Sequence, residues 1–380
     1  MADPRAPCIG LVLGGGGARA AYQVGVLKAI AEMVPPGGVS PFQVVCGASA
    51  GSINATVVAA ASSQFDEGVR RLAGVWENFE SEKVFRSDVW SALSQSARMF
   101  LGMAVGGNGA PRSILDNAPL RGLLERHIPF DRVRQSIDSG LLRALCITMC
   151  SYTTGRSVSL FQSAEESEGW VRSRRLGRGA ELRLDHLMAS SAIPMIFPAV
   201  RIGQEYFGDG SVRQTAPLSP ALHLGAEKIL VIGVRRETTL PETGSEVLTY
   251  PGFGQIAGFV LDTLFLDSLH ADIERLQRIN QTLGLVPDKS AQHTELRPID
   301  ILVISPSQDL AAIAEPLYEL FPRTVRYLLR AIGARKGNGR RLMSYLLFEP
   351  PFCRALIELG YADTMSRQAE VREFLGLAGS

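Results

Sequence analysis

Ser49 is the residue in this sequence best placed to act as a nucleophile. It lies in the pentapeptide GASAG, residues 47–51, which follows an apolar run and precedes a helical pattern. A serine on a tight strand-to-helix turn needs small residues two positions before and after it, and Gly47 and Gly51 meet that need. The segment also has a simpler interpretation, in which Ser49 only caps the following helix.

Asp209 is the candidate base. It lies in the segment YFGDGS, residues 206–211, between two glycines and just past a predicted hairpin strand. A carboxylate near its ordinary pKa of about 3.9 is a weak base for a serine hydroxyl, so a dry pocket would have to raise that pKa. The pair formed by Asp209 and Gly210 is also typical of a plain turn.

A run of glycines near the N-terminus could bind an anion. The run GGGGARA, residues 14–20, follows an apolar segment and opens a helical pattern. The backbone N–H groups of Gly15, Gly16 and Gly17 could therefore form an oxyanion hole. A dinucleotide site is the alternative, but it requires an acid closing the second strand, where the sequence has none, and the Gly-Lys-Ser/Thr of a P-loop is also missing.

No histidine fits the role of a base in a Ser-His-acid triad. Those after Asp209 lie on predicted helices or in a polar loop, and the two before it have no better setting. We expect packing or surface roles for His127, His186, His223, His270 and His293.

Strands and helices alternate in the first part of the chain. An apolar run over 8–13, the glycine run and a helix over 18–33 form one unit; a run over 42–46, the pentapeptide and a helix over 52–62 form a second. Two strand-turn-helix units in succession predict a mostly parallel sheet flanked by helices, an α/β fold. Further strands are expected at 143–152, 157–162, 199–202, 205–207, 228–234 and 299–304, and helices at 66–80 and 258–279.

Several segments have two interpretations. The helix over 258–279 has a broad apolar face that could form a lid or the wall of an acyl channel, although core packing is the simpler role. The basic segments 172–175 and 335–341 could touch anionic lipid or be solvated loops. The segments 102–112 and 240–253 indicate loops.

Composition excludes some classes of protein. The 380 residues include 39 Lys and Arg against 38 Asp and Glu, which leaves no basic field for nucleic acid. The five cysteines form no CxxC pair and no zinc-ligand spacing, which favours a reducing, cytoplasmic compartment and no metal. No apolar stretch reaches the roughly 18 residues of a membrane span, so any membrane contact is expected to be peripheral.

Together these segments resemble the patatin-like phospholipase family. The family pattern joins a GGGxR/K-G run, a GxSxG pentapeptide and a DG-G/A motif, and GGGGARA, GASAG and FGDGS stand here in that order. The segment ASSAIPMIFP, residues 189–198, is similar to the family's A-S-S-A-x-P-x-F-P segment. The resemblance covers residues 9–225 well and the remainder less securely. Ala20 and Ser211 depart from the pattern, but both are small.

The resemblance implies a patatin-like three-layer fold and a Ser-Asp dyad without histidine. Ser49 would be the nucleophile and Asp209 the base and later acid, in a hydrolase of lipid acyl esters that needs no cofactor. Arg19 matches the basic position of the family and could anchor the glycine run or meet an anionic headgroup. The remaining motif positions that carry over are Gly15, Gly16 and Gly17 for the oxyanion hole, and Gly47, Gly51 and Gly210 in support.

The chain is expected to form one α/β unit. Residues 7–225 would be the core, and residues 226–380, helical apart from two strands, would complete it. Two other functions stay open: a nucleotide- or phosphate-binding module that uses the glycine run, and a catalytically silent lipid-binding scaffold. Beyond a lipid or phospholipid substrate, the sequence points to no partner.

Overall fold

The described part of the chain comprises nine stretches. The computed structural model describes residues 7–86, 113–164, 168–236, 256, 258–260, 263, 268–285, 296–331 and 339–377. Among the predictions, the loops at 102–112 and 240–253, residues 261–262 and 264–267 of the helix over 258–279, most of the basic segment 335–341 and His293 lie outside these residues.

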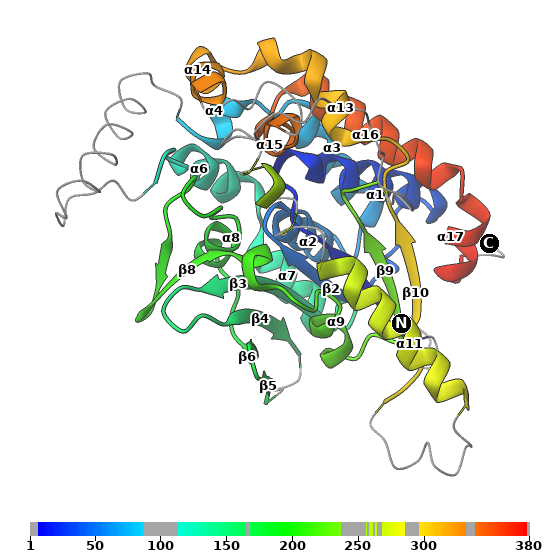
Figure 1. Ribbon diagram of the computed structural model, residues 1–380. Coiled ribbons are helices and arrows are strands. Elements are labelled where there is room, and N and C mark those ends of the chain that lie inside the picture. The colour runs from blue at the N-terminus through cyan, green and yellow to red at the C-terminus, as the bar shows by residue number, and fades with distance from the viewer. Residues whose placement is uncertain are drawn as a thin grey trace.

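One sheet runs through the described residues (Figure 1). Its strands follow the order β10-β9-β1-β2-β3-β4-β6-β5, and the hairpin β7–β8 pairs with the end of β3. The strands from β10 to β3 are parallel, and β4 is antiparallel to β3. The strands are β1 Ile9–Leu13, β2 Val44–Ala48, β3 Ala144–Ser151, β4 Ser157–Ser163, β5 Trp170–Arg172, β6 Arg175–Gly179, β7 Val200–Ile202, β8 Glu205–Asp209, β9 Lys228–Ile232 and β10 Asp300–Ile304.

The central strands are apolar on both faces. Every residue of β1, IGLVL, is buried, and the strand lies between β2 and β9. Because successive side chains of a strand point to opposite faces, Leu11 and Leu13 pack in one core and Val12 in another. Such strands are typical of parallel sheets covered by helices on both faces. The predicted fold class is confirmed.

Helices form the two outer layers. Helix α2 follows β2 on the face of Leu11, with α1, α3 and α16, and α9 and α11 pack on the face of Val12. The helices are α1 Ala21–Met33, α2 Ala50–Ala60, α3 Phe65–Glu77, α4 Ser81–Val84, α6 Ala118–His127, α7 Phe130–Asp138, α8 Leu184–Ser190, α9 Ser219–His223, α11 Ser268–Leu285, α13 Leu310–Ala314, α14 Arg323–Ala331, α15 Gly339–Leu346, α16 Pro350–Met365 and α17 Gln368–Phe374, with 3-10 turns η1 Gly17–Ala20, η2 Gly210–Arg213 and η4 Glu315–Leu320.

The two ends of the chain pack together. Helices α1 and α16 lie side by side (Figure 1), and glycines allow the close approach. A Cβ on Gly25 would lie 2.0 Å from the carbonyl oxygen of Ile357, and one on Gly360 would lie 2.2 Å from that of Tyr22. Helix α16 is therefore part of the core. Strands β9 and β10 also join the sheet of the N-terminal part, while a domain boundary at residue 225 stays a prediction.

Most predicted strands agree with the structure within two residues, and three differences matter. Strand β8 continues to Asp209, so this residue ends a strand rather than occupying a free turn. The basic segment 172–175 turns out to connect two short strands, β5 and β6, that were not predicted. Residues 258–260 are helical as predicted, but α11 continues to Leu285, past the predicted end of the helix over 258–279. Among the described residues, no helix is long and apolar enough to cross a membrane.

Candidate active site

Ser49 lies on a sharp turn between β2 and α2. The strand ends one residue before it and the helix begins one residue after it, and its φ of 52° falls where side chains are rarely accommodated. Such strain costs on the order of 1–3 kcal/mol. Only glycine fits two positions before and two positions after Ser49. A Cβ on Gly51 would lie 2.4 Å from the Leu13 carbonyl oxygen, and one on Gly47 would lie 2.5 Å from that of Gly51.

Asp209 meets Ser49 although the two are far apart in the sequence. The Ser49 Oγ donates a hydrogen bond of 2.5 Å to Asp209 Oδ2. The other carboxylate oxygen accepts the Ser211 N–H at 2.9 Å, and the Asp209 N–H donates to the Ala192 carbonyl at 2.9 Å. Ser49 is 2% exposed and Asp209 is fully buried, so bulk water is kept from the pair.

Antiparallel pairing of β8 with β3 brings Asp209 to this position. Asp209 pairs with Met149, next to Thr148, whose strand lies beside β2. Gly210 then passes close to β3, because a Cβ there would lie 2.0 Å from the Thr148 carbonyl oxygen.

Burial changes the acidity of Asp209. Removal from water raises the pKa of Asp209 to about 7, against the opposing effect of the hydrogen bonds from Ser49 and from the Ser211 backbone. Charged carboxylates are disfavoured in a dry site unless a cation compensates. At neutral pH the carboxyl group of Asp209 is therefore poised between its two protonation states.

Ser190 holds the turn from the other side. Its Oγ accepts the Ser49 N–H at 2.9 Å and donates to the Thr148 carbonyl at 2.7 Å, which ties the turn to β3. The segment around Ser190 resembles the family segment, but the sequence predicted no role for Ser190 itself. A serine within an otherwise apolar segment was the available signal.

The three glycines predicted for an oxyanion hole occupy different surroundings. Gly17 lines the same cavity as Ser49. Gly15 borders a separate small pocket, and a Cβ on Gly16 would lie 2.9 Å from a methyl group of Val234. The loop crosses the N-terminal end of α2, because Gly51 packs against the Gly14 carbonyl. Assignment of these N–H groups to an oxyanion hole stays a prediction.

Arg19 anchors the glycine run to the C-terminal part of the chain. Its Nε donates to Ser344 Oγ at 2.8 Å, and its guanidinium stacks on the Tyr345 ring, 4.0 Å from the centroid. The side chain also contacts the Tyr345 hydroxyl at 3.1 Å and is only 4% exposed. Gly17 fits beneath the same residue, because a Cβ there would lie 2.2 Å from the Tyr345 carbonyl oxygen. Of the two roles considered for Arg19, the geometry favours anchoring.

A chain of buried hydrogen bonds links the glycine run to α3. Trp76 Nε1 donates to Asn54 Oδ1 at 2.9 Å, and Asn54 Nδ2 donates to Gln23 Oε1 at 3.0 Å. Gln23 Nε2 then donates to the Gly14 carbonyl at 2.8 Å. The sequence reasoning missed these residues, although polar side chains within apolar helical segments were a visible signal. These hydrogen bonds hold the loop at Gly14, whereas Arg19 holds it at its other end.

A cavity of about 950 Å³ adjoins Ser49, a volume typical of small-molecule sites. Its wall runs along α2 and is completed by α3, α6 and the segment after α8. Most of the wall is apolar, as with Ile53, Val57, Leu72, Leu123, Ile193 and Phe348.

No histidine among the described residues takes part in the contact between Ser49 and Asp209. His186 Nδ1 accepts the Arg183 N–H at 2.9 Å, and His223 stacks on Trp170 with centroids 4.7 Å apart. Burial lowers the pKa of both. His127 lines the cavity at an exposed position. Within the described stretches, no cluster of three or more His, Cys, Asp or Glu could hold a metal ion.

Comparison with known proteins identifies the family. The pattern of the family described as Patatin-like phospholipase matches residues 11–222, more than half of the chain, and the chain belongs to this family of lipid hydrolases. No curated protein matches the sequence significantly.

Three solved structures are similar over most of the chain. VipD from Legionella pneumophila has 13% identity and a TM-score of 0.40, over 98% of this chain and 67% of that one. Human GIVD cytosolic phospholipase A2 in complex with methyl gamma-linolenyl fluorophosphonate has 12% identity and a TM-score of 0.45, over 97% of this chain and 59% of that one. The type III effector protein ExoU has 17% identity and a TM-score of 0.27, over 90% and 77%. This chain thus spans less than two thirds of the human enzyme, and likenesses this weak carry no argument about activity.

Proposed function

We propose that this chain cleaves acyl esters of lipids, as a phospholipase A or lysophospholipase, through an acyl-serine formed on Ser49. The proposal depends on one observation above all, the 2.5 Å hydrogen bond from Ser49 Oγ to Asp209 Oδ2 beside an apolar cavity. A serine hydroxyl becomes an effective nucleophile when an adjacent base takes its proton.

The reaction has two halves. In the first, the Asp209 carboxylate takes the Ser49 proton, and Oγ attacks the ester carbonyl to form a tetrahedral oxyanion. The bond to the alcohol then breaks, and Asp209 returns the proton to the leaving alkoxide oxygen. In the second, Asp209 takes a proton from water, the hydroxide displaces the acyl group from Ser49, and the proton goes back to Oγ. The products are an alcohol and a fatty acid.

The environment of the pair supports both roles of Asp209. A pKa of about 7 lets one carboxyl group act as base and then as acid near neutral pH. Developing negative charge beside Ser49 lies at the N-terminal end of the 11-residue helix α2, whose dipole favours it. Gly17, which faces the same cavity, belongs to the loop that we assign to the oxyanion.

The cavity supports a lipid acyl chain as the group that is transferred. From Ser49, Ile53 and Val57 extend its wall along α2, which rises about 12 Å over these eight residues. Burial of a methylene group is worth about 0.8 kcal/mol, so such a wall favours long chains over short ones.

Labelling and turnover together test the proposal. Wild type is expected to react with a fluorophosphonate and to release fatty acid from phospholipid, whereas Ser49→Ala does neither. Asp209→Asn is expected to lose at least about 10⁴-fold in kcat, as removal of the base from a serine hydrolase does. Ser62→Ala, a buried serine at the far end of α2 whose hydroxyl caps the Ala59 carbonyl, is the matched control and should behave as wild type.

The same experiment separates the two alternatives. An anion-binding module with an inert Ser49 would leave the fluorophosphonate unreacted. A silent scaffold would react slowly or not at all, bind lipid and release no fatty acid. Equal fatty-acid release from wild type and Ser49→Ala would overturn the proposal.

A further inference from the structure

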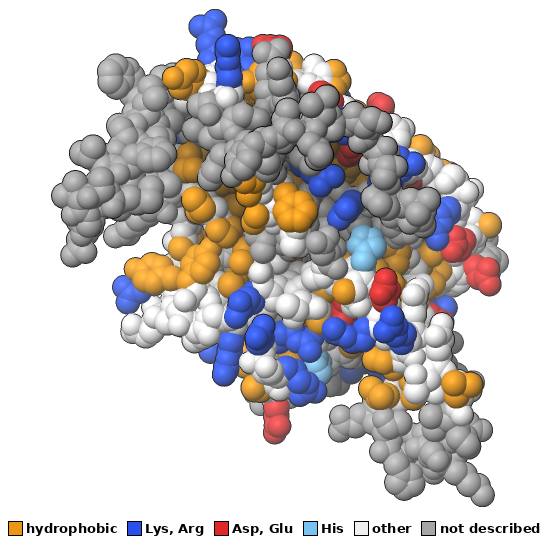
Figure 2. Space-filling model, in the orientation of Figure 1, with side chains coloured by type: hydrophobic (Ala, Val, Ile, Leu, Met, Phe, Trp, Pro, Cys, Tyr) orange, Lys and Arg blue, Asp and Glu red, His pale blue; other side chains and the backbone are white. Residues whose placement is uncertain are grey.

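Five arginines gather on one part of the surface, and we call them the arginine strip: Arg156, Arg172, Arg174, Arg175 and Arg213. Hydrogen bonds show that they are neighbours. The Ser157 N–H donates to the Arg174 carbonyl at 3.0 Å, and Arg213 Nε donates to the Gly155 carbonyl at 3.0 Å. Figure 2 shows Lys and Arg side chains gathered over β4, β6 and α9.

The strip lies at the same end of the sheet as Ser49, where the parallel strands β2 and β3 finish. Ser49 follows the last residue of β2, and β3 ends at the same edge. Strands β4 and β6 begin there, because Cys150 pairs with Ser157 and Ser157 pairs with Arg175. Three strand spacings, about 14 Å, separate β2 from β6. A bilayer surface that contacts the strip would therefore face the end of the sheet where Ser49 meets Asp209.

Within the described residues, none of the five arginines of the strip makes an ion pair with a carboxylate. Arg275 lies close by and is paired with Asp272 at 3.3 Å. Burial lowers the pKa of Arg175, and the charges of Arg275 and Arg172 lower it further, against the opposing effect of Asp272. The arginines of this region therefore repel one another.

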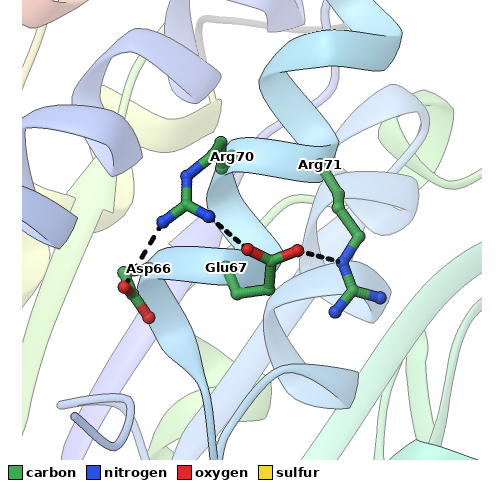
Figure 3. A network of polar contacts seen from close by, with 4 residues as sticks. All are labelled: Asp66, Glu67, Arg70 and Arg71. Carbon is green, nitrogen blue, oxygen red and sulfur yellow. Dashed lines mark hydrogen bonds and ion pairs between the residues drawn. The ribbon is translucent and has the colours of Figure 1, made fainter. Parts of the chain in front are cut away.

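Helix α3 shows the contrasting arrangement (Figure 3). Arg71 Nε contacts Glu67 at 3.0 Å, and Arg70 contacts both Glu67 and Asp66. There the charges cancel within one turn of helix. Because the whole chain has a net charge of only +1, the strip is a local excess rather than part of a basic protein. A local excess of this kind attracts an anionic surface.

Exposed apolar and aromatic groups adjoin the strip. Val171 is 64% exposed beside Arg172, and Tyr152 and Tyr206 are 46% and 47% exposed. The Tyr152 N–H donates to the Tyr206 carbonyl at 2.8 Å, so these two residues form one patch. Tyr152 Oη also lies against Gly208, where a Cβ would be 2.2 Å away, next to the candidate base. Tyrosine is suited to a membrane interface, since its ring is apolar and its hydroxyl is polar.

We propose that the arginine strip, with Val171, Tyr152 and Tyr206, docks this edge of the protein on a bilayer that contains anionic phospholipid. The strip contacts lipid phosphates while the apolar groups enter the interface. The inference rests on the proposed function, because a docked bilayer matters to an enzyme that takes lipid substrates. Docking itself is measured without turnover, so the two can fail separately.

Co-sedimentation of the full chain with vesicles tests the docking. Wild type is expected to bind vesicles of phosphatidylcholine with phosphatidylglycerol, to bind pure phosphatidylcholine weakly, and to lose affinity as salt is added. The variant Arg156→Glu/Arg172→Glu/Arg174→Glu is expected to bind the anionic vesicles at least about 100-fold more weakly, since each basic side chain near such a surface contributes about one kcal/mol. The corresponding Arg→Lys variant keeps the charge and should retain most of the binding.

A matched control carries the same change of charge elsewhere. Arg134, Arg323 and Arg354 are exposed on α7, α14 and α16, and their triple change to Glu should leave vesicle binding close to wild type. Hydrolysis of a water-soluble short-chain ester reports folding and chemistry, and we expect wild-type rates from both triple variants. Loss of this activity in all proteins alike would count against the proposed function and not against docking.

Three results would overturn the docking. One is equal binding of wild type to anionic and neutral vesicles, and another is equal loss of binding in the two triple variants. The third is retention of wild type on polyglutamate without binding to anionic vesicles, which would assign the strip to an acidic protein partner.

Discussion

At the scale of single residues, the site holds two groups in unfavourable states. Ser49 has a positive φ, and Asp209 is a carboxyl group buried beside a neutral hydroxyl rather than a cation. Each feature costs stability, and each is what an acyl-transfer site needs: a hydroxyl held on a tight turn beside the cavity and a base with a raised pKa. Functional sites commonly reduce stability in this way.

The cost of burying Asp209 predicts a pH dependence of stability. Its pKa of about 7 in the folded state lies above the ordinary value of 3.8, so between these values the folded chain holds a proton that the unfolded chain has released. Stability therefore falls as pH rises through this interval and levels off above about 7. From pH 5 to pH 8 we expect wild type to lose about 3 kcal/mol in the free energy of unfolding relative to Asp209→Asn.

Urea unfolding at the two pH values measures this difference. Asp131→Asn, at an exposed position on α7, is the control and should follow wild type at both. Parallel behaviour of wild type and Asp209→Asn would contradict the raised pKa.

At the scale of elements, backbone segments approach one another so closely at the site that only glycine fits at the points of contact. The glycine run crosses the first turn of α2 at Gly51, and β3 runs against Gly210. The Ser190 hydroxyl ties the turn at Ser49 to the sheet, and the side-chain amide of Gln23 ties the glycine run to α1. The strand-turn-helix units thus position the site through main-chain contacts.

Two glycine substitutions test whether this close approach of backbones requires glycine, one at the site and one in a helix with open space around it. Gly51→Ala is expected to destabilise the protein by about 1–3 kcal/mol and to lower kcat, because its Cβ would overlap the carbonyl oxygens of Leu13 and Gly14. Gly122→Ala, in α6 with open space around the new methyl group, should be stabilising by about 0.5–1 kcal/mol. Thermal unfolding and ester turnover check both, and a harmless Gly51→Ala would mean that the loop yields easily.

At the scale of the whole molecule, the C-terminal part closes over the N-terminal part. Strand β9 lies beside β1, α16 packs on α1, and α15 supplies the partners of Arg19. All three lie beyond the stretch that matches the family. The glycine run is therefore held by residues that are distant in sequence, and the two parts should unfold together.

Arg19 tests this closure. Arg19→Met is expected to destabilise the protein by about 2–4 kcal/mol. The change removes the stacking on Tyr345 and the charged hydrogen bonds of Arg19, and it leaves the Ser344 and Tyr345 hydroxyls buried without this partner. Lys28→Met, on the same helical stretch with one contact 5.7 Å from the Tyr361 centroid, should change stability by less than about 0.5 kcal/mol. Denaturant unfolding measures both, and equal effects would refute an anchoring role.

Local features of this protein followed from its sequence alone. Apolar runs predicted the strands, and their alternation with helical patterns predicted the α/β fold, because these signals depend on neighbouring residues. Ser49 and Asp209 could be singled out for the same reason, since each lies in a glycine setting that only a few backbone geometries require. The unpredicted strands β5 and β6 are short and partly polar, so no periodic signal marked them.

Only the tertiary structure decided which distant residues are in contact. The contact between Ser49 and Asp209 spans 160 positions, and the contact of Arg19 with Ser344 spans 325. The pKa of Asp209, the cavity beside Ser49 and the gathering of the arginine strip follow from such long-range pairings. The physical reason is that burial and charge proximity depend on the register of strands and the packing of helices, which no local pattern of residues specifies.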